Sequence, residues 1–348
     1  MPVLSAILLG VCLAVGVGPV LAFLCAVALV AAVLAAVHHA EVVAHRVGEP
    51  LGTLVLALAV TVIEASLILS MMLSGGEGAA ALARDTVFSA VMVICNGVVG
   101  LCLLVGGLRH GEQSFRVEGA GPGIAALIAL TTLSLVLPTF TTSTPSGTYS
   151  PAQLVFAAVA SLALWGAYVF FQTVRHRDYF LPVAGLRDPE AHAERPSVRA
   201  SLASFVLLLV SLVAVVGLAK VLSPSIERAV DAAGAPKTVI GIAIAVLVLL
   251  PETLAALRAA RADRLQTSMN LSVGSALASI GLTIPAVVAA SLLFGIPLVL
   301  GLGAKDITLL ALTFLVSTVT LGTGRTSLMQ GAVHLVLFFA FLFLALAP

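Results

Sequence analysis

Each of two long apolar segments of the sequence contains a single glutamate. Glu64 lies in TLVLALAVTVIEASLILSMM, and Glu252 lies in TVIGIAIAVLVLLPETLAALRAA. A charged group at such depth in a bilayer costs at least ~2.5 kcal/mol, so it usually faces a protein interior or a water-filled ion path. Because burial disfavours the charged form of a carboxyl group, a proton and a cation compete for it near neutral pH. The pair therefore indicates a site that trades protons for cations.

The alternative is a glutamate permanently paired with a buried Lys or Arg. No Lys or Arg falls in the middle of an apolar segment, and Arg258 lies six positions past Glu252. A membrane enzyme that hydrolyses lipid pyrophosphates would also use paired glutamates, but it needs clustered Lys or Arg to hold phosphate. Both alternatives are therefore disfavoured.

Further oxygen ligands are needed around the glutamates, because Ca2+ takes six to eight and two carboxylates supply up to four. Thr61, one turn before Glu64, is either a ligand or a threonine bonded back to its own helix. Pro251, directly before Glu252, frees a carbonyl one turn earlier. Asn96 and Ser275, each in the apolar segment that follows a glutamate segment, add an amide and a hydroxyl. For both, a ligand role and a structural role stay open.

A second polar group marks the end of an earlier apolar segment. His38, Glu41, His45 and Glu49 are spaced three to four residues apart and share one helix face. We interpret Glu41 and His45, with Glu227 in the second half, as a polar vestibule or proton relay. A solvated interface and a zinc site are the alternatives. Zinc fits less well, because the second half lacks the histidines.

The composition requires a membrane. Of 348 residues, 60% are hydrophobic and 9% are charged, and the mean hydropathy is +1.18, so lipid must be the solvent for most of the surface. The apolar runs are long and do not alternate, which predicts an all-α polytopic protein. The net charge of +1 argues against nucleic acid as a partner. Cys12, Cys25, Cys95 and Cys102 lack metal-site spacing and are interpreted as buried apolar residues.

About eleven spans are predicted, near residues 3–17, 20–37, 51–73, 86–108, 122–139, 151–174, 199–222, 237–258, 267–293, 300–320 and 328–347. The first lacks a basic start, and a second span follows almost at once. We therefore interpret it as a retained helix rather than a signal peptide. The polar stretch 175–198 is predicted to be a loop that divides the chain. If this loop is cytoplasmic, 12 of the 17 basic residues fall on its side, which predicts an N-terminus inside and a C-terminus outside.

The two halves share a pattern. Residues 41–50 and 227–236 both read E-x6-G-x-P, at an offset of 186 residues, and each is followed by a glutamate segment. These glutamates fall in an odd and an even span, which run in opposite directions. The repeats are therefore inverted, the architecture of many secondary transporters. The predicted division is an extra helix at 1–19, a first repeat at 20–174, a linker at 175–198 and a second repeat at 199–348.

Two strings carry a family resemblance: HHAEVVAHRVGEPLGTLVLALAVTVIEASLILSMML and LVLLPETLAALRAARADRLQTSMNLSVGSALASIGLTIP. They resemble the two alpha-repeats of the cation/calcium exchanger superfamily, and most of all its bacterial Cha-type calcium (sodium, potassium):proton antiporters. The resemblance implies two inverted five-helix repeats plus one extra N-terminal helix, in the bacterial inner membrane. It also implies alternating access by sliding of the first helix of each repeat.

By the same resemblance, Glu64 and Glu252 are the cation ligands that also carry protons. Thr61 and Leu249 stand where related exchangers have an asparagine in a GNATE-like motif. Asn96 and Ser275 fall where GS-type motifs place serines. The missing asparagines leave the site poorer in oxygens than is typical of a calcium exchanger, so the cation preference stays open.

The sequence therefore predicts a secondary cation:proton antiporter that exports Ca2+ in exchange for H+. The alternatives are Na+ or K+:proton antiport, a channel and, more remotely, the lipid-pyrophosphate phosphatase. Ca2+, H+ and the lipid bilayer are the expected partners, and no cofactor is expected. The absence of a GxxxxGK[ST] string agrees with transport that uses no ATP.

Overall fold

The computed structural model describes residues 1–16, 18–48, 51–75, 78–180 and 196–347. They form an almost entirely helical protein, as the apolar runs predict. The α-helices are α1 (Pro2–Val15), α2 (Pro19–Val47), α3 (Leu51–Ser74), α4 (Leu82–Met92), α5 (Val99–His110), α6 (Val117–Thr131), α7 (Leu137–Phe140), α8 (Pro151–Phe170), α9 (Val198–Ala232), α10 (Thr238–Arg261), α11 (Leu265–Phe294), α12 (Ala304–Gly322) and α13 (Leu328–Leu346).

Short elements complete the chain. Three stretches of π-helix continue the α-helices at Val93–Val98, Thr132–Val136 and Phe171–Arg175, and 3-10 turns lie at Ala79–Ala81 and Arg177–Phe180. Two short strands, β1 (Gln113–Ser114) and β2 (Arg325–Thr326), pair antiparallel. π-Helical turns are rare and often lie at functional sites, so the one that contains Asn96 is of particular interest.

Ten helical segments among the described residues are long and apolar enough to cross a membrane, five before the central loop and five after it. An odd number of crossings per half means that the second half enters the membrane from the opposite side, as the inverted repeat requires. The remaining predicted span is α1. It has 14 residues, or about 21 Å at 1.5 Å per residue, which is short of the ~30 Å hydrocarbon core.

The chain divides into two compact units, and neither unit coincides with a half of the sequence. The first unit contains Met1–Leu82 and Asp188–Val248, and the second contains Ala83–Arg187 and Leu249–Pro348. Each unit therefore combines helices from both halves. Helix α10 begins in the first unit and ends in the second. Most of the predicted linker, residues 181–195, lies outside the described residues.

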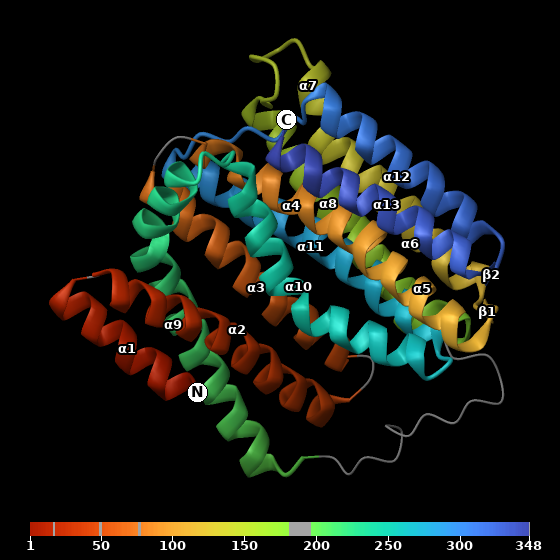
Figure 1. Ribbon diagram of the computed structural model, residues 1–348, viewed down its shortest axis with the longest axis horizontal. Helices are drawn as coiled ribbons and strands as arrows, with labels where there is room; N and C mark the ends of the chain where they lie inside the picture. Colours follow the sequence, from red (N-terminus) through yellow and green to blue (C-terminus); the bar gives the residue numbers. More distant parts are fainter. Residues whose placement is uncertain (17, 49–50, 76–77, 181–195, 348) are drawn as a thin grey trace. The chain divides into compact units, whose positions relative to one another are not determined.

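In the first unit, α2 and α9 pack along each other, and both α1 and α3 contact this pair (Figure 1). Small side chains on α2 allow the close approach, since Ala32, Ala36 and Ala40 are fully buried. On α9, Gly217 faces Leu9 of α1 so closely that a side chain there would collide with it.

In the second unit, α11 packs against α6, α8 and the π-helical stretch Val93–Val98. Helix α13 lies along α5, and α12 lies along α6 (Figure 1). Gly281 of α11 allows the contact with α8, because a Cβ there would lie 2.7 Å from the Cβ of Trp165.

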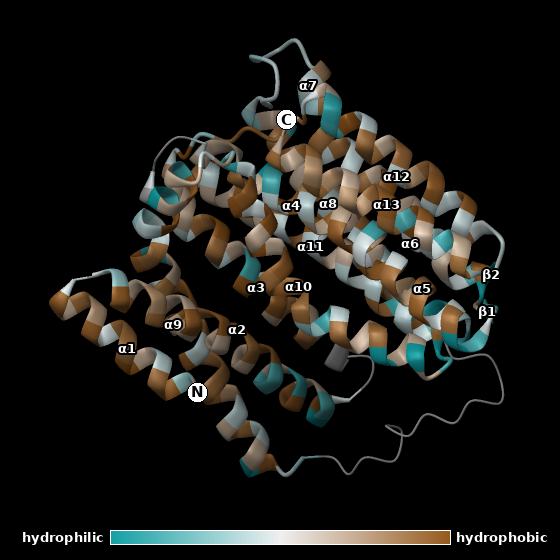
Figure 2. Ribbon diagram, viewed as in Figure 1, coloured by the Kyte–Doolittle hydropathy of each residue, from teal (hydrophilic) through white to brown (hydrophobic). Residues whose placement is uncertain are grey.

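The outer surface of the helices is apolar, and the hydrophilic residues concentrate near helix ends and connections (Figure 2). Large apolar side chains that are more than half exposed include those of Leu13, Phe23, Val213, Leu293, Phe339 and Phe343. Exposing this much apolar surface to water would be unfavourable, and soluble proteins rarely do so. Surrounding lipid removes that cost.

Candidate functional site

Glu64 is buried within α3. Its exposed fraction is 2%, although no Lys or Arg shares its helix. Ile63, Ala65 and Ile68 beside it are also buried. Nearer the end of α3, Ser70 donates a hydrogen bond to the carbonyl of Val216 on α9, which fixes the two helices together within the first unit. The apolar helix therefore holds a carboxylate inside protein rather than against lipid.

Thr61 lies one turn before Glu64, and it is also buried, with 7% exposed. The i, i+3 spacing places the hydroxyl and the carboxylate on the same side of α3. Among the described residues, Thr61 makes no hydrogen bond to the carbonyl one turn earlier, as Thr253 and Thr313 do, so the back-bonded alternative gains no support and the ligand role stays a prediction.

Glu252 belongs to the second unit and is half-buried on α10. Pro251 directly before it does not end the helix, which continues to Arg261. The carbonyl of Leu249 accepts a hydrogen bond from the hydroxyl of Thr253 at 2.7 Å. The second half thus repeats the arrangement of the first, in which an apolar helix contains a single glutamate well inside it.

Asn96 is fully buried in the π-helical stretch Val93–Val98. Its Nδ2 donates to Thr313 Oγ1 of α12 at 2.8 Å, and its Oδ1 lies 3.3 Å from Nδ1 of His334 on α13. The other ring nitrogen of His334, Nε2, lies 3.1 Å from Thr320 Oγ1 of α12. Asn96 therefore belongs to a polar network that joins three segments of the second unit. We call Asn96, Thr313, Thr320 and His334 the amide network.

Two glycines bring α13 close enough for the amide network to form. A Cβ added at Gly331 of α13 would lie 2.5 Å from the backbone nitrogen of Leu104 and 2.9 Å from the carbonyl oxygen of Gly100. A Cβ at Gly100 would lie 2.9 Å from the Cβ of His334. Because the backbones meet at these two points, the ring of His334 is held within hydrogen-bond distance of Asn96.

Sequence reasoning identified Asn96 but missed Thr313, Thr320 and His334. One signal was available for His334, which is the only ionisable residue in the apolar helix LMQGAVHLVLFFAFLFLAL. A histidine inside a membrane span is a candidate functional residue for the same reason as a glutamate. No comparable signal existed for the threonines, which are common in apolar helices and often bond to their own backbone.

Ser275 lies half-buried on α11, between the buried Ser272 and Ser279. Among the described residues, no hydrogen bond joins Ser275 to Asn96. The structure therefore places both predicted residues in the second unit without connecting them directly.

The predicted vestibule lies in the first unit. Glu41 and His45 are exposed near the end of α2, whereas Glu227 is half-buried on α9 and accepts a hydrogen bond from Ser223 at 3.4 Å. His39, which was not among the predicted residues, lies 3.3 Å from Ser204 of α9. Glu49 is outside the described residues. In the part of the chain that the structure describes, no three His, Cys, Asp or Glu gather as a metal site would require, so the zinc alternative gains no support.

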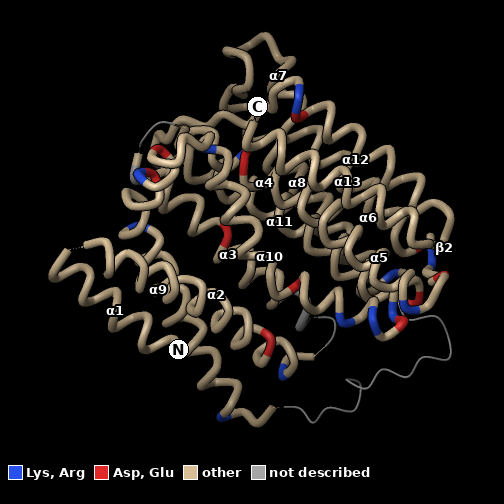
Figure 3. Tube along the Cα trace, viewed as in Figure 1, with Lys and Arg blue, Asp and Glu red and all other residues tan. Residues whose placement is uncertain are grey.

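Basic residues gather at one end of the second unit, beside β1 and β2 (Figure 3). Hydrogen bonds connect the loops there. Arg116 donates to the carbonyl of Asp178, His110 lies 3.0 Å from the carbonyl oxygen of Arg261, and Gln113 donates to Asp263. These loops are the ones that the charge pattern assigned to a single side of the membrane. We call this end the basic end.

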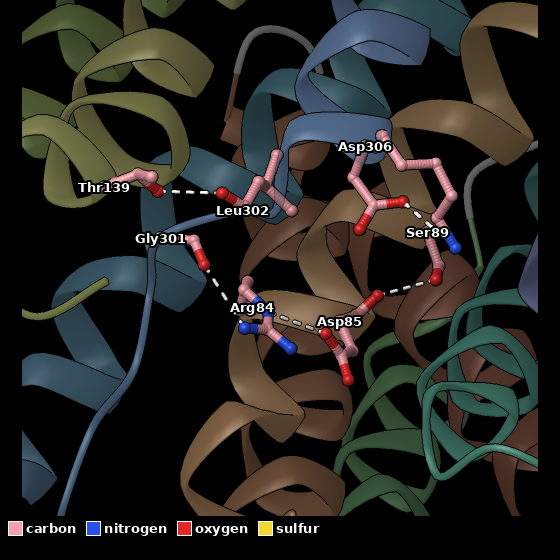
Figure 4. A network of polar contacts seen from close by, with 8 residues as sticks. Arg84, Asp85, Ser89, Thr139, Gly301, Leu302 and Asp306 are labelled. Atoms are coloured by element: carbon pink, nitrogen blue, oxygen red, sulfur yellow. Dashed lines mark hydrogen bonds and ion pairs between the residues drawn. The ribbon is translucent and has the colours of Figure 1, made fainter. Parts of the chain in front are cut away.

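A second set of charges in the second unit lies at the start of α4, beside the loop that precedes α12 (Figure 4). Arg84 forms an ion pair with Asp85 at 2.8 Å and donates to the carbonyl of Gly301 at 3.2 Å. Thr139 donates to the carbonyl of Leu302 at 2.8 Å. The loop before α12 is thereby tied to the start of α4 and to α7.

The fold and these buried polar groups define a polytopic membrane protein built from two five-helix halves. The chain belongs to the sodium/calcium exchanger protein family, which matches residues 17–174 and again residues 203–347. The putative ionic transporter y4hA of Sinorhizobium fredii is 51% identical, and the match covers 92% of this chain and 87% of that protein. The sodium-potassium/proton antiporter ChaA of Escherichia coli is 36% identical over 88% of this chain and 83% of its own length.

Solved structures share the fold. Native YfkE superposes with a TM-score of 0.76 at 17% sequence identity, covering 99% of this chain and 98% of YfkE. The H+/Ca2+ exchanger CAX gives a TM-score of 0.73 at 17% identity, covering 98% of this chain and 87% of that one. At such low identity these likenesses establish the fold alone.

Proposed function

We propose that this protein is a secondary active antiporter that exchanges protons for cations through Glu64 and Glu252. The observation that carries the proposal is that each half of the chain places one carboxylate well inside an apolar helix. A carboxylate there binds either a proton or a cation. Thr61, Asn96 and Ser275 are proposed as further ligands, with Glu41, His45 and Glu227 as the vestibule.

Two cation classes are candidates for transport. Ca2+ is the first, because two carboxylates with amide and hydroxyl oxygens suit a hard divalent ion. Na+ or K+ is the second, and two observations favour it: the 36% identical relative is a sodium-potassium/proton antiporter, and the side chains of Thr61 and Leu249 supply no amide oxygen. Membership of an exchanger family gives no support to the phosphatase alternative.

The exchange cycle follows from competition between ions. Cation binding from the cytoplasm displaces protons from Glu64 and Glu252. Protons that enter from outside neutralise the same carboxylates and release the cation there. We propose that the repeats span 20–174 and 199–348 and that their first helices slide during the cycle. The packing of these helices, α2 and α9, along each other within one unit supports movement as a pair.

The first test is proton flux in proteoliposomes with an internal pH dye, adding Ca2+, Na+ or K+ singly between pH 7 and 9. We expect Ca2+ to release protons, with a half-saturating concentration that falls as the pH rises, because fewer protons then compete for the carboxylates. A response to Na+ or K+ alone would assign monovalent antiport. A response to none of the three ions would contradict the proposal.

The proposed orientation places the basic end, the 175–198 linker and the N-terminus in the cytoplasm of a bacterial inner membrane. It requires α1 to cross the membrane as a short eleventh span, because five crossings alone would leave the N-terminus on the side opposite the linker. Glu112 at the basic end and Thr142 in the loop after α7 are both exposed. With the four native cysteines replaced, Glu112→Cys should react with an impermeant maleimide only in inside-out vesicles. Thr142→Cys should react only in intact spheroplasts. The reverse pattern would invert the topology.

A further inference from the structure

We propose that His334 is a positioning residue that fixes the carboxamide of Asn96 so that its oxygen can serve a transported cation. The inference rests on the proposed function, because it assigns a role within the same ion site. It depends on the hydrogen-bond directions in the amide network, on the count of lone pairs at Asn96, and on the close packing that holds His334.

The hydrogen-bond directions follow from the single hydroxyl proton of Thr313. Its Oγ1 donates to the carbonyl of Leu309, one turn earlier on α12, at 2.8 Å, with the weaker acceptor Met92 Sδ at 3.5 Å as the alternative. With that proton committed, Oγ1 can only accept from Asn96, so Nδ2 of the amide faces Thr313 and Oδ1 faces His334. Since Oδ1 is an acceptor, Nδ1 of His334 is the donor in this contact, and the backbone of the neighbouring Cys95 is a second hydrogen-bond partner of the ring. A neutral ring then accepts at Nε2 from the hydroxyl of Thr320.

The bonding capacity of the Asn96 amide is almost fully used. One N–H is directed at Thr313 and the other at the sulfur of Met92, 3.8 Å away. The amide oxygen has two lone pairs, and His334 occupies one of them. Among the contacts of the described residues, one lone pair of Oδ1 is left, which is the group that a hard cation binds.

Without His334, the orientation of the amide would be less strongly set. The donor at Nδ1 distinguishes Oδ1 from Nδ2, so a carboxamide turned by 180° would set an N–H against another N–H. An Asn96 turned in this way would offer a donor where the cation needs an oxygen. His334 thereby acts on the cation through Asn96, and the Gly100–Gly331 contact keeps the ring in place.

The test compares substitutions of His334 that place a polar group at the position of Nδ1, at the position of Nε2, or at neither. His334→Asn retains an N–H donor at about the position of Nδ1, whereas His334→Gln places its amide near the position of Nε2, toward Thr320. His334→Leu keeps neither. In proteoliposomes, with the cation to which wild type responds most strongly, we expect His334→Leu and His334→Gln to raise the half-saturating concentration roughly 3- to 10-fold, the cost of one hydrogen bond. The maximal rate should change less, and His334→Asn should stay within about 2-fold of wild type.

A double substitution separates positioning from general stability. Asn96→Ala should weaken cation binding by itself, and adding His334→Leu should then have little further effect, because the two residues act as a unit. Equal half-saturating concentrations for His334→Asn and His334→Gln would overturn the inference, as would a full additional loss in the Asn96→Ala background. If wild type exchanges no cation for protons, the proposed function itself fails.

An independent measurement needs no transport. The 15N spectrum of protein labelled at histidine, with His334→Leu used to assign the signal, should show a neutral His334 ring protonated at Nδ1. A ring protonated at Nε2 would mean that Asn96 is turned the other way, and it would overturn the inference even in a protein that transports normally.

Discussion

Glu64→Gln and Glu252→Gln should each abolish cation:proton exchange while leaving a folded protein. Glutamine keeps the size of the side chain and one of its two oxygens, but it neither releases a proton nor carries the charge that attracts the cation. We expect the exchange rate to fall at least ~100-fold, equivalent to about 2.7 kcal/mol of lost stabilisation. Folding should survive, because a neutral amide costs less to bury than a carboxylate.

The measurement is the dye-reported proton flux in proteoliposomes, after size-exclusion chromatography has shown that each variant is monodisperse. Glu118→Gln is the matched control, since this glutamate is exposed near the start of α6, and it should leave the flux unchanged. Normal transport by folded Glu64→Gln would remove this residue from the site. The same outcome for Glu252→Gln would remove the second residue independently.

The second large effect is expected on stability, at the contact between α5 and α13. Gly331→Val would force a side chain against the backbone nitrogen of Leu104 and the carbonyl oxygen of Gly100, at 2.5 and 2.9 Å from its Cβ. Backbone atoms of packed helices cannot move aside cheaply, so we expect a loss of about 3 kcal/mol, at the upper end of the usual range for overpacking. The loss should appear as a lower unfolding temperature in detergent.

Gly166→Val in α8 is the control for this substitution. Gly166 is helical like the buried Gly331 but half-buried, and nothing lies within 4 Å of a Cβ built there. It should therefore unfold within a few degrees of wild type. If the two variants unfold at the same temperature, the close approach of α13 to α5 is not a determinant of stability.

The sequence by itself determined that the protein lies in a lipid bilayer, where its spanning helices run, and which glutamates are candidate ion ligands. A bilayer leaves no water for backbone groups, so each spanning helix must satisfy its own hydrogen bonds and can be predicted from local composition. Glu64 and Glu252 were evident for the same reason, because a carboxylate in such a helix is costly and needs a function. The charge pattern also predicted which loops share a side, and the structure brings those of the second unit together at the basic end.

Only the tertiary structure decided which helices share a unit and what surrounds Asn96. The spatial units mix the two halves of the chain, an arrangement that no linear pattern shows. Asn96 meets Thr313 and His334 across 217 and 238 positions of sequence. Those contacts depend on glycines that let two backbones meet, which is a property of packed pairs of helices and not of either helix alone.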